Sequence, residues 1–132
     1  MEDLHLPATA LTPEVRLDAK SGVFSMRGES YPEHVLSFYA PILEKLQGVL
    51  ETGWHARFQV ELHITYFNSA SAKAIHRLLK LLDQTAEKGC GIKLLWHYDE
   101  EDDMAKDLGR DIREDFHHLD VVEVPMAAAA AL

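Results

Sequence analysis

Residues 58 to 67 carry the pattern that most constrains the fold, because apolar and polar side chains alternate there without a break. The apolar set is Phe58, Val60, Leu62, Ile64 and Tyr66, and the mostly polar set is Gln59, Glu61, His63, Thr65 and Phe67. A period of two is that of a β-strand, whose successive side chains point to opposite faces. One apolar and one polar face predict a sheet that carries helices mainly on one side.

This strand leads directly into an amphipathic helix through Asn-Ser-Ala-Ser at 68–71. Either Asn68 or Ser69 is suited to cap the helix, since short polar side chains accept first-turn N–H groups. The apolar stripe of the helix is Ile75, Leu78, Leu79, Leu82 and Ala86, and the opposite face is Lys73, Arg77, Lys80, Gln84 and Glu87. Gly89 is expected to end it.

The remaining pattern predicts strands and helices on both sides of this unit. A hairpin is expected from 15–18 and 23–26, a helix from about Pro32 to Gly53 with a kink at Pro41, a strand at 92–98, a helix at 102–116 and a strand at 121–126. Alternating helices and strands after a hairpin indicate a mixed, partly parallel sheet with right-handed crossovers. The expected fold class is α/β, a two-layer mixed β-sheet.

Length and composition bound the class of protein. The chain has 132 residues, enough for one domain, which we place at 1–126, with a low-complexity alanine tail at 127–132. A formal net charge of -9 disfavours nucleic acid and anionic membranes as partners. The sequence has one cysteine, no run of about 20 apolar residues and no secretion signal at its start, so we expect a cytoplasmic protein without membrane insertion.

No enzymatic motif is evident. The sequence contains neither a glycine-rich phosphate loop nor a Gly-x-Ser-x-Gly elbow. Cys90, between two glycines, is interpreted as a small residue in a tight turn, because no activating neighbour is visible. The acidic run at 99–103 lacks the ligand spacing of a calcium loop and is interpreted as a solvated loop and helix start. We therefore expect a protein that is not an enzyme and has no cofactor.

Eight histidines raise the possibility of a metal site. His63 and His97 are expected on the polar faces of two strands, where they could meet, but no spacing in the sequence matches a zinc motif. We therefore expect no metal, and keep a small-ligand or metal-binding domain as an alternative.

The junction at 68–71 has two interpretations. A serine there can simply cap the helix, which contributes about 1 kcal/mol. A hydroxyl there can also be phosphorylated, because free N–H groups and the positive end of the helix dipole would stabilise the phosphate. The modification would add roughly -1.5 to -2 charges to a small, flat surface. Helix geometry alone favours the cap.

Four stretches taken together change that preference. They are GESYPE at 28–33, FYAPI at 38–42, YFNSASAK at 66–73, and WHY at 96–98 followed by acids. In this order, and over nearly the whole chain, they resemble the SiaC-type regulatory phosphoproteins, a family with a STAS-like fold similar to that of anti-sigma-factor antagonists. Ser69 stands where the family often has threonine, and Ala70 where it often has serine.

The resemblance implies a non-enzymatic switch. It implies that a cognate serine/threonine protein kinase phosphorylates Ser69, with Ser71 as the second candidate, and that a PP2C-type phosphatase reverses the modification. The unmodified form is implied to bind and activate a diguanylate cyclase, in control of cyclic di-GMP and biofilm formation. The expected partner-binding surface is Asn68, Ser69, Ala70 and Ser71, extended by Lys73 and Arg77 on the exposed side of the helix.

A second hypothesis keeps the same fold and switch with a different partner. The chain would then be an anti-sigma-factor antagonist in a partner-switching system, which binds a kinase that also sequesters a sigma factor. Identification of the bound partner, a sigma-binding kinase or a cyclase, separates these two hypotheses.

Overall fold

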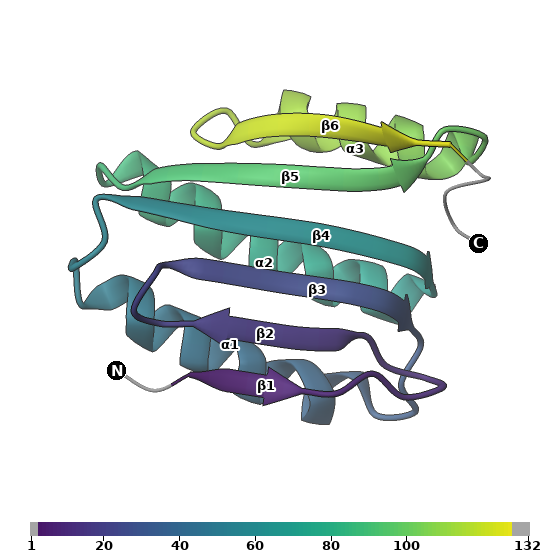
Figure 1. Cartoon of the computed structure of the whole chain (residues 1–132), viewed down its shortest axis with the longest axis horizontal. Helices are drawn as coiled ribbons and strands as arrows, with labels where there is room; N and C mark the ends of the chain where they lie inside the picture. Colours follow the sequence, from purple (N-terminus) through teal and green to yellow (C-terminus); the bar gives the residue numbers. More distant parts are fainter. Residues whose placement is uncertain (1–2, 128–132) are drawn as a thin grey trace.

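A computed structural model describes residues 3–127 as one six-stranded sheet with three helices (Figure 1). The strands are β1 (Leu4–Leu6), β2 (Glu14–Asp18), β3 (Val23–Ser30), β4 (Arg57–Phe67), β5 (Gly91–Asp99) and β6 (Asp120–Met126). The helices are α1 (Val35–Glu51), α2 (Ser69–Glu87) and α3 (Asp103–Asp115). Apart from Ala127, the expected alanine tail lies outside the described residues.

The strands lie in the sheet in their sequence order, from β1 to β6. β1, β2 and β3 pair antiparallel, whereas β3, β4, β5 and β6 pair parallel, each step crossing over through one helix. All three helices lie behind the sheet in the view of Figure 1, so the opposite face is open. The expected two-layer α/β fold with a mixed sheet is confirmed. The short strand β1 was not expected.

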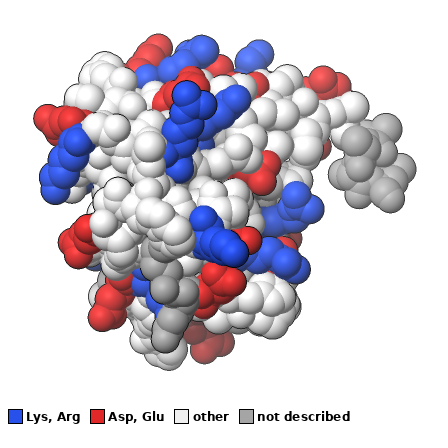
Figure 2. Space-filling model, turned by 60° about the vertical axis from the view of Figure 1, so that its left-hand side comes forward, with Lys and Arg blue, Asp and Glu red and all other residues white. Residues whose placement is uncertain are grey.

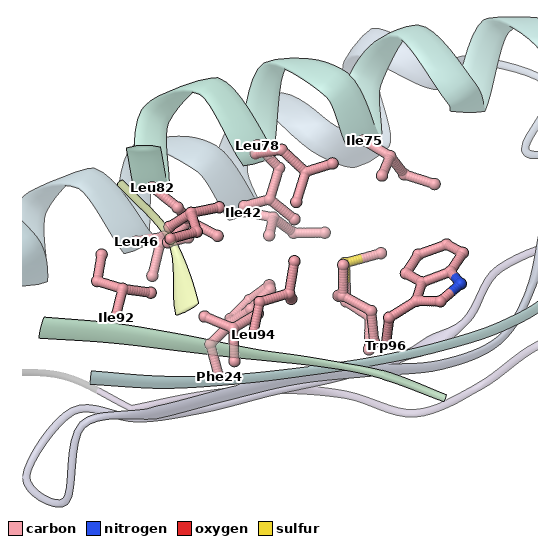
Figure 3. Close-up of a cluster of buried hydrophobic side chains, with 14 of the residues drawn as sticks. Phe24, Ile42, Leu46, Ile75, Leu78, Leu82, Ile92, Leu94 and Trp96 are labelled. Atoms are coloured by element: carbon pink, nitrogen blue, oxygen red, sulfur yellow. The ribbon is translucent and has the colours of Figure 1, made fainter. Parts of the chain in front are cut away.

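The core fills the space between the helices and one face of the sheet (Figure 3). Ile42 and Leu46 from α1 and Leu78 and Leu82 from α2 point toward the sheet, where Phe24, Ile92, Leu94 and Trp96 meet them. All eight are at most 2% exposed. The alternation in β4 and the stripe in α2 therefore face each other, and their burial in one layer is the main stabilising contribution expected.

The first helix begins later than expected. It starts at Val35 with His34 as the N-terminal cap residue, and Pro32 lies before it in a buried position. Strand β3 extends instead to Ser30, which pairs with Phe67, and the Tyr31 N–H donates to the carbonyl of Leu11 at 2.8 Å. The pairing of Ser30 with the central strand β4 and the bond of Tyr31 to the loop before β2 satisfy these backbone groups, and they outweigh the helix-start signal of the proline.

Tyr66 does not share the buried face of β4. The register between β3 and β4 shifts after Gly28, so that Glu29 pairs with Tyr66 and leaves Thr65 as an extra residue. Such a bulge reverses the side-chain alternation beyond it. Tyr66 is therefore 55% exposed, and Phe67 packs against the core in its place. The expectation that Tyr66 continues the apolar face is wrong for this reason.

The open face of the sheet is polar at its centre and apolar toward β6. Val122 and Val124 pair with Leu95 and His97, which point away from the helices, so the apolar set of the last strand faces outward. In the view of Figure 2, acidic and basic side chains are interspersed and no large area of one sign is seen. Within residues 3–127, none of the helices has the length and apolar character needed to cross a membrane.

Candidate phosphorylation and partner-binding site

The junction between β4 and α2 is built around Asn68. Its backbone is extended, with φ -90° and ψ 175°, and its side-chain oxygen accepts the N–H of Ser71 at 2.9 Å. The Asn68 N–H donates to the carbonyl of Ser30, so the junction is also tied to β3. Of the two candidate caps, Asn68 is the one used, and Ser69 is the first residue of the helix.

The two serines of the junction have opposite environments. Ser69 and Ala70 are exposed, whereas Ser71 is fully buried. First-turn N–H groups have no intrahelical acceptor, and the helix dipole places partial positive charge there. An anion on the Ser69 hydroxyl would lie beside that charge. Ser71 is inaccessible to a modifying enzyme while the first turn of α2 is folded.

Ser71 belongs to a chain of buried hydroxyl groups that joins three elements. The Ser30 hydroxyl donates to the Ser71 hydroxyl at 3.0 Å, and the Tyr39 hydroxyl lies 2.5 Å from that of Ser30. Because Ser30 gives its single proton to Ser71, Tyr39 is the donor to Ser30. Burial raises the pKa of Tyr39, partly offset by its bond to Ser30, so the phenol stays protonated and able to donate. The chain holds the start of α2 against α1 and β3.

Sequence reasoning missed Ser30 and Tyr39 as parts of this site. Ser30 lies before the helix that the sequence predicts from about Pro32, and Tyr39 lies inside that predicted helix. Ser30 and Ser71 are 41 residues apart, and no local pattern indicates that their hydroxyl groups meet. The pairing of Ser30 with Phe67 brings them together.

Two tyrosines lie where the neighbouring strands β3 and β4 end. The rings of Tyr31 and Tyr66 pack edge to face with centroids 5.4 Å apart, next to the end of β4. Tyr66 is more than half exposed because of the bulge, and Tyr31 is partly exposed. The site therefore presents aromatic surface beside the exposed serine, a combination that suits protein recognition.

Lys73 and Arg77 are exposed on α2, as expected. Lys73 lies four residues after Ser69, on the same side of the helix, and Arg77 follows one turn later. Within the described part of the chain, neither side chain forms an ion pair. Both charges are therefore available to an acidic partner or to a phosphate on Ser69.

His63 and His97 meet on the open face, with ring centroids 6.1 Å apart. His97 also lies 3.5 Å from a carboxylate oxygen of Glu61. Burial lowers the pKa of His63, and His97 and Arg27 lower it further. Among residues 3–127, no group of three or more His, Cys, Asp or Glu side chains is placed to hold a metal ion. The histidine pair is thus a feature of the open face and is separate from the junction.

Cys90 lies far from the junction, at the end of α2, and its thiol donates to the carbonyl of His55 at 3.3 Å. Burial raises its pKa, which disfavours the reactive thiolate. Its interpretation as a packing residue in a turn agrees with this environment.

The fold and the junction define a small α/β domain with an exposed serine where a central strand meets a helix. The chain belongs to the SiaC family of regulatory phosphoproteins, whose family model matches residues 6–126. An uncharacterized protein of Pseudomonas aeruginosa strain UCBPP-PA14 is 33% identical over 115 residues, which are 87% of this chain and 90% of that protein.

Two solved structures are similar to it along almost the whole length. The crystal structure of apo-SiaC from Pseudomonas aeruginosa matches with a TM-score of 0.83 at 31% identity, over 96% of this chain and 100% of that chain. The crystal structure of the diguanylate cyclase SiaD in complex with its activator SiaC matches with a TM-score of 0.83 at 30% identity, over 95% of this chain and 99% of that chain.

Proposed function

We propose that this protein is a non-enzymatic switch whose unphosphorylated form binds and activates a diguanylate cyclase. Its membership of the SiaC family supports this, as does its likeness to the structure that contains the cyclase SiaD and its activator SiaC. Phosphorylation of Ser69 by a serine/threonine protein kinase ends the activation, and a PP2C-type phosphatase restores it. The switch operates in the cytoplasm, where the substrate and product of such a cyclase are found.

The exposure of Ser69 at the open start of α2 is the observation that carries the proposal. A kinase must seat the accepting hydroxyl in its own active site, so an exposed serine qualifies and the buried Ser71 does not. The helix N-terminus and the charge of Lys73 would both stabilise the phosphate. The modified protein would therefore stay folded. The phosphate would also place a dianion in the middle of a surface whose charged members, Lys73 and Arg77, are both basic.

The expected partner-binding surface is Asn68, Ser69, Ala70 and Ser71, together with Lys73 and Arg77. Ser71 contributes by positioning, since its side chain is buried, whereas the exposed members contact the partner directly. A partner seated on Ser69 and Ala70 would have to desolvate the phosphate or meet it with its own acids, and either costs binding free energy.

The test measures cyclic di-GMP synthesis by purified diguanylate cyclases from the protein's own cells, each with and without this chain. The unmodified protein and Ser69→Ala should stimulate one cyclase strongly, and Ser69→Asp should stimulate it at least about tenfold less. Ser69→Asn is the matched control, because it has the size of aspartate without the charge, and it should retain most of the stimulation.

Intact-mass analysis of protein isolated from cells completes the test. Wild type should gain one phosphate that a PP2C-type phosphatase removes, and Ser69→Ala should gain none. The proposal is wrong if no cyclase responds to the unmodified protein. It is also wrong if a sigma-binding kinase is the bound partner, which would favour an anti-sigma-factor antagonist.

A further inference from the structure

A cavity opens at the carboxyl end of the sheet, where β4 and β5 separate. The two strands pair as far as Leu62 and Trp96, and beyond this point the described residues of β4 pair only with β3 and those of β5 only with β6. Figure 1 shows the two strands moving apart toward their carboxyl ends, where α/β sheets commonly bind ligands. The cavity at this place encloses about 350 Å³, which suits a small molecule.

Tyr98 brings an unpartnered hydroxyl group to this cavity. The residue is only 8% exposed, and within residues 3–127 its hydroxyl group has no hydrogen-bond partner. In the same part of the chain, no side-chain nitrogen or oxygen atom is both sealed from solvent and unpartnered, so this hydroxyl group reaches open space. The space that Tyr98 lines is the cavity. Because buried tyrosines usually have a hydrogen-bond partner, the hydroxyl group is placed to bind a ligand there.

Charged groups of opposite sign line the cavity. Arg27 comes from β3, whereas Asp99 and Asp102 come from the end of β5 and the start of α3. One oxygen of each acid accepts a local N–H, that of Glu101 for Asp99 and that of Ala105 for Asp102. Within the described residues, Arg27 forms no ion pair with an acid, and neither acid forms one with a base. These charges are therefore available to a ligand.

The rest of the lining is mostly apolar and adds no permanent positive charge. Ile64 and Met126 contribute apolar surface. Burial lowers the pKa of His63, and the charges of His97 and Arg27 lower it further, so the ring of His63 is uncharged at neutral pH. The cavity thus has a basic group, two acidic groups and an apolar wall.

We propose that this cavity binds a small zwitterion of the amino-acid class. Its carboxylate lies on the Arg27 guanidinium, which can donate two parallel hydrogen bonds, and its ammonium group lies at Asp99 and Asp102. The Tyr98 hydroxyl group can donate to the carboxylate or accept from the ammonium group. A simple anion would face two acids and a simple cation would face Arg27, whereas a zwitterion complements both.

The zwitterion site is separate from the expected partner-binding surface. None of the residues of that surface lines the cavity. The nearest part of the chain is Thr65, which lines the cavity three residues before Asn68. Binding at the cavity is therefore an additional property of the fold, and it does not depend on the proposed function.

The experiment titrates the full-length, isotope-labelled protein with each proteinogenic amino acid in turn and follows the backbone amides by NMR. At least one amino acid should shift the amides of Thr65, Tyr98 and Asp102 in a saturable way, with a dissociation constant at or below about 1 mM. The inference is wrong if no amino acid saturates these signals, or if the saturable shifts lie in another part of the molecule.

Two derivatives of the amino acid that binds test its two charges separately. The amide lacks the carboxylate and the N-acetyl derivative lacks the ammonium group, so each should bind at least about tenfold more weakly than the parent. Equal binding of the parent and either derivative would show that the ligand is not held as a zwitterion, and this result would overturn the inference.

Variants assign each charge to its partner. Arg27→Gln should weaken binding of the parent at least about tenfold and should no longer distinguish it from the amide. Asp102→Asn keeps a side chain that can cap α3, and it should distinguish less between the parent and the N-acetyl derivative. Arg57→Gln is the matched control, since Arg57 is exposed at the other end of β4 and does not line the cavity.

The control decides whether the loss is specific to the cavity. Arg57→Gln should bind the amino acid like wild type, and thermal unfolding must show all three variants folded. A loss as large in Arg57→Gln as in Arg27→Gln would indicate a general effect of charge and would overturn the inference. Unchanged binding in Arg27→Gln would do the same.

Discussion

The side-chain oxygen of Asn68 accepts the backbone N–H of Ser71 at 2.9 Å, and this bond sets which serine of the junction is exposed. With Asn68 as the cap, Ser69 becomes the first helical residue and faces solvent, and Ser71 is turned into the core. A single residue thus controls the stability of the helix start and the presentation of the expected phosphorylation site.

Replacing the cap should cost stability. Asn68→Ala removes the acceptor of the Ser71 N–H, and the free energy of unfolding should fall by about 1 kcal/mol. Urea unfolding followed by circular dichroism measures this. Asn68→Asp keeps an acceptor of the same shape and adds a charge that the helix dipole favours, so it should unfold like wild type or later. Equal losses for both variants would contradict the capping role.

The buried hydroxyl chain should behave as one unit. Tyr39→Phe and Ser71→Ala each leave a hydrogen-bonding group of Ser30 without a partner. Each should lower the free energy of unfolding by about 1–3 kcal/mol. Because both act through Ser30, the double variant should cost less than the sum of the two by at least roughly 0.5 kcal/mol. Urea unfolding of the four proteins gives this coupling. Strict additivity would show that Tyr39 and Ser71 are independent.

The contact between α3 and the sheet depends on Gly109. A Cβ at this position would lie 2.5 Å from Cδ1 of Trp96, a buried ring whose N–H donates to the carbonyl of Ala105 at 2.9 Å. The ring cannot move without losing that bond, so Gly109→Ala should lower the free energy of unfolding by about 1–3 kcal/mol.

Gly48 provides the matched control for this substitution. It also lies inside a helix, but a Cβ there would meet no atom within 4 Å. Gly48→Ala should therefore raise the free energy of unfolding by up to about 1 kcal/mol, because alanine has the higher helix propensity. Thermal unfolding of both variants would show opposite shifts, and a stabilised Gly109→Ala protein would refute the close contact.

The histidine pair on the open face should make stability depend on pH. The pKa of His63 is lowered from 6.5, by burial first and then by His97 and Arg27, so the folded protein takes up fewer protons at this group than the unfolded chain. Unfolding then takes up protons, and the contribution of His63 to stability is lost as pH falls from the ordinary histidine value to the lowered one.

Urea unfolding at about pH 7.5 and about pH 5 measures this effect. Wild type should lose stability toward the lower pH, and His63→Gln should lose less, because the group that resists protonation is gone. Arg27→Gln should also reduce the loss, since it removes one of the charges that lower the pKa of His63. An unchanged pH dependence in His63→Gln would contradict the assignment.

Most of the fold could be predicted because it follows from local patterns. The alternation from Phe58 to Ile64 and the stripe from Ile75 to Leu82 each require one buried face, and the structure buries those faces against each other. The parallel order of the later strands follows from their alternation with helices. The predicted start of the first helix is wrong, because the pairing of Ser30 with Phe67 is a long-range contact with no local signal.

The candidate site was only partly predictable for the same reason. A capping residue and a small polar junction are visible in Asn68 and Ser69 themselves, and the family resemblance rests on the residues around them. The bulge that exposes Tyr66 and the hydroxyl chain that buries Ser71 depend on β3 and α1. From the sequence, Ser71 is the second candidate for phosphorylation after Ser69. In the structure Ser71 is buried and Ser69 is exposed.

The sequence by itself determined the order of elements from β2 onward, most of their buried faces and a helix start at 68–71, because these depend on side-chain periodicity and local hydrogen bonds. Only the tertiary structure decided which serine is exposed and which tyrosine leaves the core. Those features arise where residues distant along the chain compete for the same space and the same hydrogen-bonding partners, and that competition is settled by packing.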